Sequence, residues 1–237
     1  MKLLKRNCSI SMRLVPKGAG WTYVYLDICG DNHEFIISNV IGDQFSDLVF
    51  MMCHLYPGNC DPENAYHNME YAHVLCKNTA DGYKAVSIVD TDYVVEDSSS
   101  RIYHIAHKGE FTWDEEGGWS NWVVEREPTL DNSFELIIHI EHLGRNDEAA
   151  RKYNYKVPYR DFCYAVAKAC TETIKKHGFI GYHHSVGYHD INIRRLLFLK
   201  CIALNNFEAC ELTYYEDNEH GETTDINKEI ELLLFEM

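Results

Sequence analysis

Hydrophobic and polar positions alternate over much of the first 143 residues, which is the pattern of strands that bury one face. The runs are rich in β-branched and aromatic residues, and turn formers such as Gly30-Asp31-Asn32 separate neighbouring runs. Two hairpins and further short strands are predicted, at residues 21–28, 34–40, 70–76, 83–89, 102–106, 119–125 and 134–140.

A helical period replaces this pattern at three places. Between Asp43, a suitable N-cap, and a following Pro-Gly pair, apolar residues recur at helical spacing and predict a first helix. Residues 157–176 bring apolar side chains to one face and predict a second helix that ends before a glycine. Residues 191–204, with Asp190 as the N-cap, predict a third.

Together these elements predict an α+β fold, with an antiparallel β-sheet and one inserted helix in the N-terminal part, followed by two packed helices. The tail allows a hairpin of residues 207–215 and 229–235 or a short helix over 226–235, and the hairpin is favoured. No Pro/Gly/Ser-rich linker divides the chain. A single domain over 1–237 is expected, and a soft division near 144–156 is the alternative.

Composition adds one strong constraint, which is charge. The chain has 37 acidic and 22 basic side chains and a formal net charge of −15. Such a charge repels nucleic-acid phosphate and anionic lipid, and it attracts basic proteins and cations. Because 46% of the residues are hydrophobic, the charge belongs to a folded body and not to a disordered tail. We therefore expect a basic protein partner, and neither a nucleic acid nor a membrane.

Nine cysteines occur at irregular spacings without a C-x-x-C pair. This predicts free thiols and argues against a disulfide framework or a zinc ribbon. The N-terminal segment has too short an apolar stretch for a signal peptide, and no run approaches the length of a membrane helix. These features predict a cytoplasmic protein.

The densest group of metal-ligand residues lies in the sequence GYHHSVGYHD, residues 181–190. His183, His184, His189 and Asp190 are ligand types for a divalent metal, the only cofactor that we consider. Their spacing matches no recognised zinc motif. A surface loop whose histidines bond backbone groups or water is the favoured interpretation.

Two histidine pairs, His104 with His107 and His139 with His142, stand three residues apart in predicted strands. Positions three apart on a strand face opposite sides of the sheet, so neither pair is expected to grip one ion. His139 shares a face with Glu141. We expect an exposed cross-strand charge contact there and not an acid–base pair.

Acidic and aromatic residues gather around the sequence DEEGG. Aromatic rings flanked by acids are typical of an interface that buries the rings and pairs the charges with Lys or Arg. The alternative is that the tryptophans are ordinary core and sheet-face residues. The predicted partner-binding residues are Trp113, Asp114, Glu115, Glu116, Trp119 and Trp122.

The order of elements supports a family resemblance. A hairpin, a capped helix opening with GDQFSDLV, a strand with Glu70, Tyr71 and Leu75, and a late helix running into GFIGYHHSVGYHDINIRRLLFLK resemble a group of small bacterial proteins. Some of that group are similar to immunity proteins that accompany secreted polymorphic toxins. The chain departs from the group by lacking a Trp after Gly181-Tyr182 and by having Asp190-Ile191 in place of an aromatic-Pro pair. The resemblance implies a binding role and supplies no catalytic residues.

Three hypotheses about function follow. The first is a non-enzymatic acidic binding protein, an immunity or inhibitor protein that blocks a basic protein partner. The second is a divalent-metal-dependent hydrolase or lyase that uses the loop of His183, His184, His189 and Asp190. The third is a structural subunit that forms a homo-oligomer.

Overall fold

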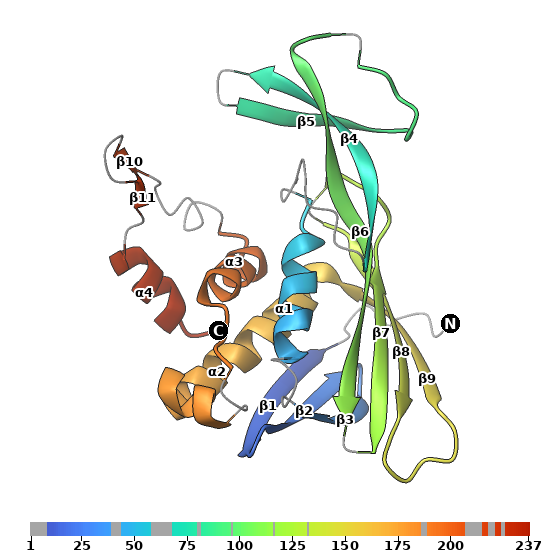
Figure 1. The fold of residues 1–237 in the computed structure, drawn as a ribbon, viewed down its shortest axis with the longest axis vertical. Helices are drawn as coiled ribbons and strands as arrows, with labels where there is room; N and C mark the ends of the chain where they lie inside the picture. Colours follow the sequence, from blue (N-terminus) through green and yellow to red (C-terminus); the bar gives the residue numbers. More distant parts are fainter. Residues whose placement is uncertain are drawn as a thin grey trace.

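The computed structural model describes residues 9–38, 44–57, 68–79, 82–95, 97–115, 117–131, 133–185, 189–206, 215–217, 221–223 and 226–237. A nine-stranded antiparallel sheet forms one layer, and the helices lie against one of its faces (Figure 1). We call that face the inner face and the opposite one the outer face. The predicted α+β class with a large antiparallel sheet is confirmed.

The strands are β1 (Ile10–Gly18), β2 (Trp21–Ile28), β3 (Asp31–Ser38), β4 (Met69–Thr79), β5 (Gly82–Val89), β6 (Ser100–Glu115), β7 (Gly118–Glu125), β8 (Glu135–Leu143), β9 (Arg151–Pro158), β10 (Tyr215–Asp217) and β11 (Gly221–Thr223). The helices are α1 (Gln44–His54), α2 (Tyr159–Ser185), α3 (Ile193–Leu204) and α4 (Ile226–Leu234). The prediction missed β1 and β9. Both are edge strands that carry a proline and several basic residues, which protect an edge from further pairing and also hide the hydrophobic alternation.

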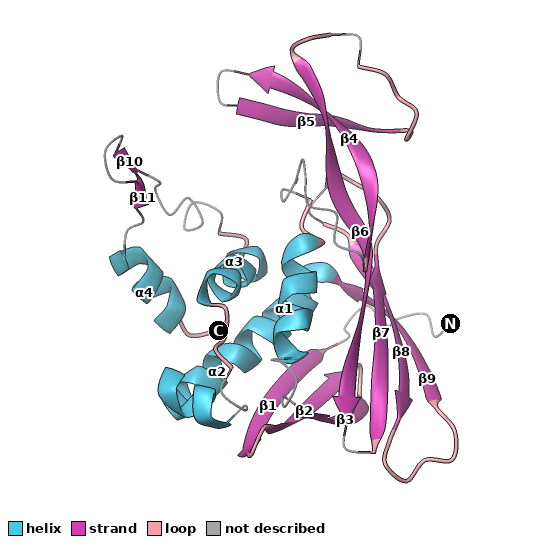
Figure 2. Ribbon diagram, in the orientation of Figure 1, coloured by secondary structure: helices cyan, strands magenta, loops and turns pink. Residues whose placement is uncertain are grey.

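Strand β6 connects two parts of the sheet. The strand order is β1-β2-β3-β6-β7-β8-β9, with β4 paired to both β5 and β6. The first part of β6 pairs with β4, and the last part pairs with β7. The β4–β5 hairpin and the start of β6 therefore project from the body as an arm (Figure 2), which has a small core of Val74, Cys76 and Ile105.

The sheet turns sharply between β3 and β6, which are joined by the single residue pair Ile37–Glu115. Strands β1 to β3 consequently pack their inner face against that of β6 to β9. The ring centroid of Phe35 on β3 lies 5.6 Å from that of Trp113 and 5.3 Å from that of Trp122. All three rings are fully buried and form the centre of the core.

Helices α1 and α2 cover the rest of the inner face. The predicted first helix is confirmed as α1, and its apolar face, with Phe45, Leu48 and Met52, is buried. The hydroxyl of Tyr159, at the start of α2, donates to the backbone carbonyl of Met52 at 2.6 Å. This bond ties the two helices together inside the core.

The other two predicted helices exist, with different ends. The helix predicted to end before Gly178 does stop there: Gly178 has the non-helical φ of 69° and ψ of 170°, and α2 resumes beyond this kink as a second helical segment that ends at Ser185. The N-cap of α3 is Asn192 and not the predicted Asp190. The side chain of Asn192 accepts a hydrogen bond from the backbone N–H of Arg195 at 3.0 Å.

The favoured hairpin for the tail is wrong over residues 226–234, which form helix α4, while residues 207–214 lie outside the described part of the chain. Leu232 of α4 is buried against α3. The ammonium group of the buried Lys200, on α3, donates to the carbonyls of Leu233 and Phe235 at 3.0 and 3.1 Å. This tertiary contact satisfies the C-terminal carbonyls of a helix too short to be stable alone.

The cysteines correct one prediction. Cys53, Cys76, Cys163 and Cys170 are free and buried. Cys29 and Cys201, however, are disulfide-bonded, so the prediction that all nine thiols are free is wrong. Disulfides depend on the approach of two cysteines in the fold, for which the spacing in the sequence is a poor guide. No helix within the described ranges has the length and apolar content needed to cross a membrane.

Candidate functional site

The outer face of β6 to β9 is the candidate site. Because alternate residues of a strand point to opposite sides, it carries the side chains that the core does not use. In the described part of the chain no helix lies over this face (Figure 2). The outward-pointing residues are Lys108, Glu110, Thr112, Asp114, Trp119, Asn121, Val123, Glu125, Ile137, His139, Glu141, Lys152, Asn154 and Lys156.

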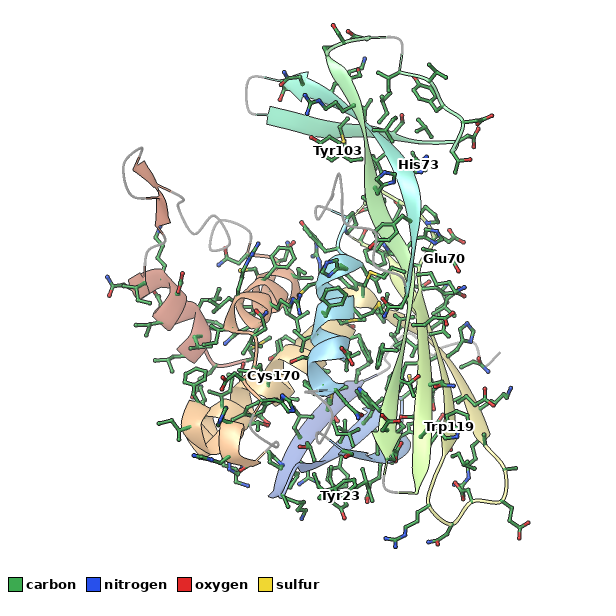
Figure 3. All side chains as sticks on the ribbon, viewed as in Figure 1. Tyr23, Glu70, His73, Tyr103, Trp119 and Cys170 are labelled. Carbon is green, nitrogen blue, oxygen red and sulfur yellow. The ribbon has the colours of Figure 1, made fainter. Side chains whose placement is uncertain are left out.

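Strand alternation divides the six predicted partner-binding residues. Asp114 and Trp119 are directly opposite each other on neighbouring strands and lie on the outer face. Figure 3 shows Trp119 on the side of the sheet away from the helices. Glu116 lies outside the described residues. The remaining three residues, Trp113, Glu115 and Trp122, point inward.

Trp113 and Trp122 are core residues with no exposed surface. Their ring centroids lie 4.7 Å apart, and the indole N–H of Trp113 donates to the backbone carbonyl of Gln44 at 2.8 Å. Neither ring can reach a partner while the protein stays folded. The sequence contained the signal for this division, because Trp119 and Trp122 differ by an odd number of positions on one strand.

A shallow depression of about 410 Å³ lies in the middle of the outer face. Its lining includes the short polar side chains of Thr112, Asn121 and Asn154, together with His139 and Lys152. The hydroxyl of Thr112 donates to the side-chain oxygen of Asn121 at 2.7 Å. Glu110 and Glu141 also line the depression. The depression therefore offers both hydrogen-bonding groups and carboxylates to a partner.

Carboxylates outnumber lysines on this face and its margins. Six carboxylates, Glu70, Glu110, Asp114, Glu125, Glu135 and Glu141, stand among three lysines, Lys108, Lys152 and Lys156. Cross-strand ion pairs join Lys108 to Glu70 at 2.5 Å and Lys152 to Glu141 at 3.4 Å. The hydrogen bond from Lys108 lowers the pKa of Glu70, so this carboxylate stays charged. Such exposed pairs contribute little to stability.

His139 lies within this charged surface. Its ring nitrogens face the side-chain oxygen of Asn154 and, at 3.3 Å, a carboxylate oxygen of Glu125. The predicted cross-strand contact therefore exists, but Glu125 on β7 is the partner and not Glu141. His142 points to the inner face, so the members of this histidine pair face opposite sides as predicted.

Glu115 and His142 form a buried pair where the sheet turns between β3 and β6. Nε2 of His142 lies 3.3 Å from the carboxylate of Glu115, which also accepts the backbone N–H of Ile36 at 3.1 Å. Nearby, Nε2 of His33 lies 2.6 Å from the hydroxyl of Tyr155, and burial lowers the pKa of His33. The prediction did not bring these residues together, because they come from four different strands.

The four predicted metal ligands, His183, His184, His189 and Asp190, do not all come together in the fold. Nδ1 of His183 lies 2.8 Å from a carboxylate oxygen of Asp190, and the rings of His183 and His184 meet edge to face. Among the residues whose positions are described, no three His, Cys, Asp or Glu side chains are arranged to hold a metal ion. The geometry thus brings His183 into contact with Asp190 and with His184, without forming a set of three metal ligands among the described residues.

Cys53 precedes His54 in α1, and a thiol beside an imidazole can be an activated nucleophile, but the surroundings of Cys53 do not favour that role. The thiol is buried and donates to the backbone carbonyl of Arg195 at 3.4 Å. Burial raises the pKa of Cys53 to about 12, and a thiol that is not ionised is a poor nucleophile.

Comparison with known proteins adds no identification. No protein-family model, no curated protein sequence and no solved structure matches this chain.

Proposed function

We propose that this protein is a non-enzymatic binding protein that attaches to a basic protein partner through the outer face of β6 to β9. The observation that carries the proposal is the excess of carboxylates on a sheet face that no described helix covers, around a polar depression. A surface of this kind is complementary to a patch of Lys and Arg. An inhibitor or immunity protein that blocks a basic toxin is the form of this function that we favour.

The overall charge supports the same proposal. A net charge of −15 attracts a basic partner over distances of about 8–10 Å at physiological salt and increases the association rate. Within the contact, Asp114 has no ion pair with a described residue, so its charge is available to a partner. Trp119, opposite Asp114, supplies an aromatic ring of the type that concentrates binding energy.

The two alternatives receive less support. A metal-dependent hydrolase or lyase would need His183, His184, His189 and Asp190 to converge, but no three such side chains among the described residues are arranged to hold a metal ion. A homo-oligomeric structural subunit stays a prediction, which light scattering of the purified protein would test directly.

The experiment compares two triple variants that remove the same charge. In the first, Glu110→Gln, Asp114→Asn and Glu141→Gln neutralise the outer face. In the second, Asp90→Asn, Asp92→Asn and Glu231→Gln neutralise exposed acids on a loop and on α4, away from that face. Proteins retained from an extract of the source cells at low and at moderate salt are identified, and the association rate of the purified partner is then measured.

We expect the outer-face variant to associate more slowly and to lose most of its salt dependence, because steering depends on charge near the contact. The control variant should keep most of the parent's association rate. Equal losses in both variants would mean that only net charge matters and would contradict the assignment of the face. Failure to retain any basic protein at low salt would contradict the function itself.

A further inference from the structure

A second cleft lies away from the outer face of β6 to β9. It is an open cleft with a volume of about 640 Å³, lined by residues of strands β1 to β3 and helix α2. This volume is in the range of sites that hold small molecules and exceeds the 410 Å³ of the depression described above. The cleft therefore has room for a ligand that the partner-binding face does not explain.

Two cations reach the cleft from facing elements, Arg13 from β1 and Lys168 from α2. Each lies over an aromatic ring: the guanidinium carbon of Arg13 is 4.3 Å from the centroid of Tyr25, and Nζ of Lys168 is 5.8 Å from that of Tyr164. Neither forms an ion pair with a described carboxylate. An aromatic face orients a cation without neutralising it, so both positive charges remain available.

Carboxylates line the same cleft. Glu34 comes from β3 and Glu172 from α2, and neither is within ion-pair distance of a cation among the described residues. Asp27 of β2 also lines the cleft, and its carboxylate accepts the backbone N–H of Gly30 at 3.2 Å. Lys168 and Glu172 have the i, i+4 spacing at which helix residues commonly pair, yet Lys168 lies over the ring of Tyr164 instead. The cleft thus presents charges of both signs that do not neutralise each other by contact.

His33 also borders the cleft, through β3. Its ring is held by the hydroxyl of Tyr155 at 2.6 Å and by the ring of Tyr153, with centroids 4.4 Å apart. Because neighbouring residues of a strand point to opposite sides, the imidazole faces away from Glu34 and takes no part in the contacts proposed below.

We propose that this cleft binds a small zwitterion of amino-acid size. The carboxylate of the ligand contacts Arg13 and Lys168, and its ammonium group contacts Glu34 and Glu172. Its carbon chain lies against the rings of Tyr25 and Tyr164. One ligand with both charges can contact the cations and the carboxylates that line this cleft without pairing, whereas a simple anion or cation would contact only one of the two sets.

The test is calorimetric titration of the purified protein with each proteinogenic L-amino acid in turn. Any amino acid that binds is then compared with its N-acetyl derivative, which lacks the ammonium group, and with its amide, which lacks the carboxylate. We expect at least one amino acid to bind and both of its derivatives to lose most of the affinity. Absence of binding by every amino acid, or equal binding by the derivatives, would overturn the proposal.

Matched variants locate the site. Arg13→Gln and Lys168→Gln should each weaken binding by about tenfold or more, because each removes a charge-assisted contact. Lys17→Gln is the control for Arg13, since Lys17 also lies over a tyrosine, 5.2 Å from the centroid of Tyr23, but outside the cleft. Lys176→Gln is the control in α2. If the controls weaken binding as much as the cleft variants, the ligand binds elsewhere and the assignment fails.

Discussion

The phenolic oxygen of Tyr155 lies 2.6 Å from Nε2 of His33, although 122 residues separate them in the chain. The contact joins β9 to β3, which share no backbone hydrogen bonds within the described sheet. Side chains alone therefore close the core at this position. The burial that lowers the pKa of His33 therefore exists only in the folded protein.

The first prediction concerns pH. Burial lowers the pKa of His33 below 6.5 and outweighs the opposing effect of Asp31, while His142 lowers it further and Asp27 raises it. Because the unfolded chain binds this proton more readily, stability present above pH 6.5 should be lost as the pH falls through 6.5 toward the folded pKa. The measurement is the urea unfolding midpoint at about pH 7.5 and about pH 5.

A variant isolates this contribution. His33→Gln should reduce the difference between the two midpoints, whereas His139→Gln, on the outer face, should leave it close to that of the parent protein. An unchanged pH dependence in His33→Gln would show that other groups dominate the response.

The second prediction separates two tryptophans of β7. Trp122→Ala should destabilise the fold by about 3–5 kcal/mol, because it removes a fully buried ring from the core. Trp119→Ala should leave the melting temperature near that of the parent and should speed dissociation of the basic partner, at a cost of about 2 kcal/mol in affinity. Thermal melts and dissociation kinetics on both variants provide the measurement. A large loss of melting temperature in Trp119→Ala would make it a packing residue.

The third prediction concerns Lys200, whose pKa is lowered from 10.5 to about 8, mainly by burial and also by Lys175. The unfolded chain binds this proton more strongly, so stability should rise as the pH increases from about 8 to 10.5. Unfolding midpoints across this range should show the rise in the parent protein. It should shrink in Lys200→Met but persist in the control Lys176→Met. A rise of equal size in Lys200→Met would assign it to other groups.

The fourth prediction concerns thiols. Because Cys29 and Cys201 are disulfide-bonded, at most seven of the nine cysteines should react with a thiol reagent under denaturing, non-reducing conditions. All nine should react after reduction. The measurement is the mass of the alkylated protein before and after reduction. Nine reactive thiols without reduction would mean that the native protein keeps these cysteines reduced, as expected in the cytoplasm.

Local pattern was enough to predict most of the secondary structure. The periodicity around Phe45 and Leu48 predicted α1, and alternation predicted strands β2 to β5, β7, β8 and residues 102–106 of the longer β6, because burial of one face imposes a regular spacing on nearby residues. The same principle was insufficient for the edge strands β1 and β9, where charge and proline at an open edge interrupt the alternation. It was also insufficient for α4, which depends on the contact of Lys200 with its last carbonyls.

The sequence by itself determined which residue types the protein has, their charge and the two sides of each strand. Only the tertiary structure decided which side is covered. It placed Trp122 in the core and Trp119 outside, turned Glu115 inward to His142, and brought Arg13 and Lys168 to one cleft. The physical reason is that burial and pairing of charges depend on contacts between residues far apart in the chain. Such contacts leave no regular spacing in the sequence.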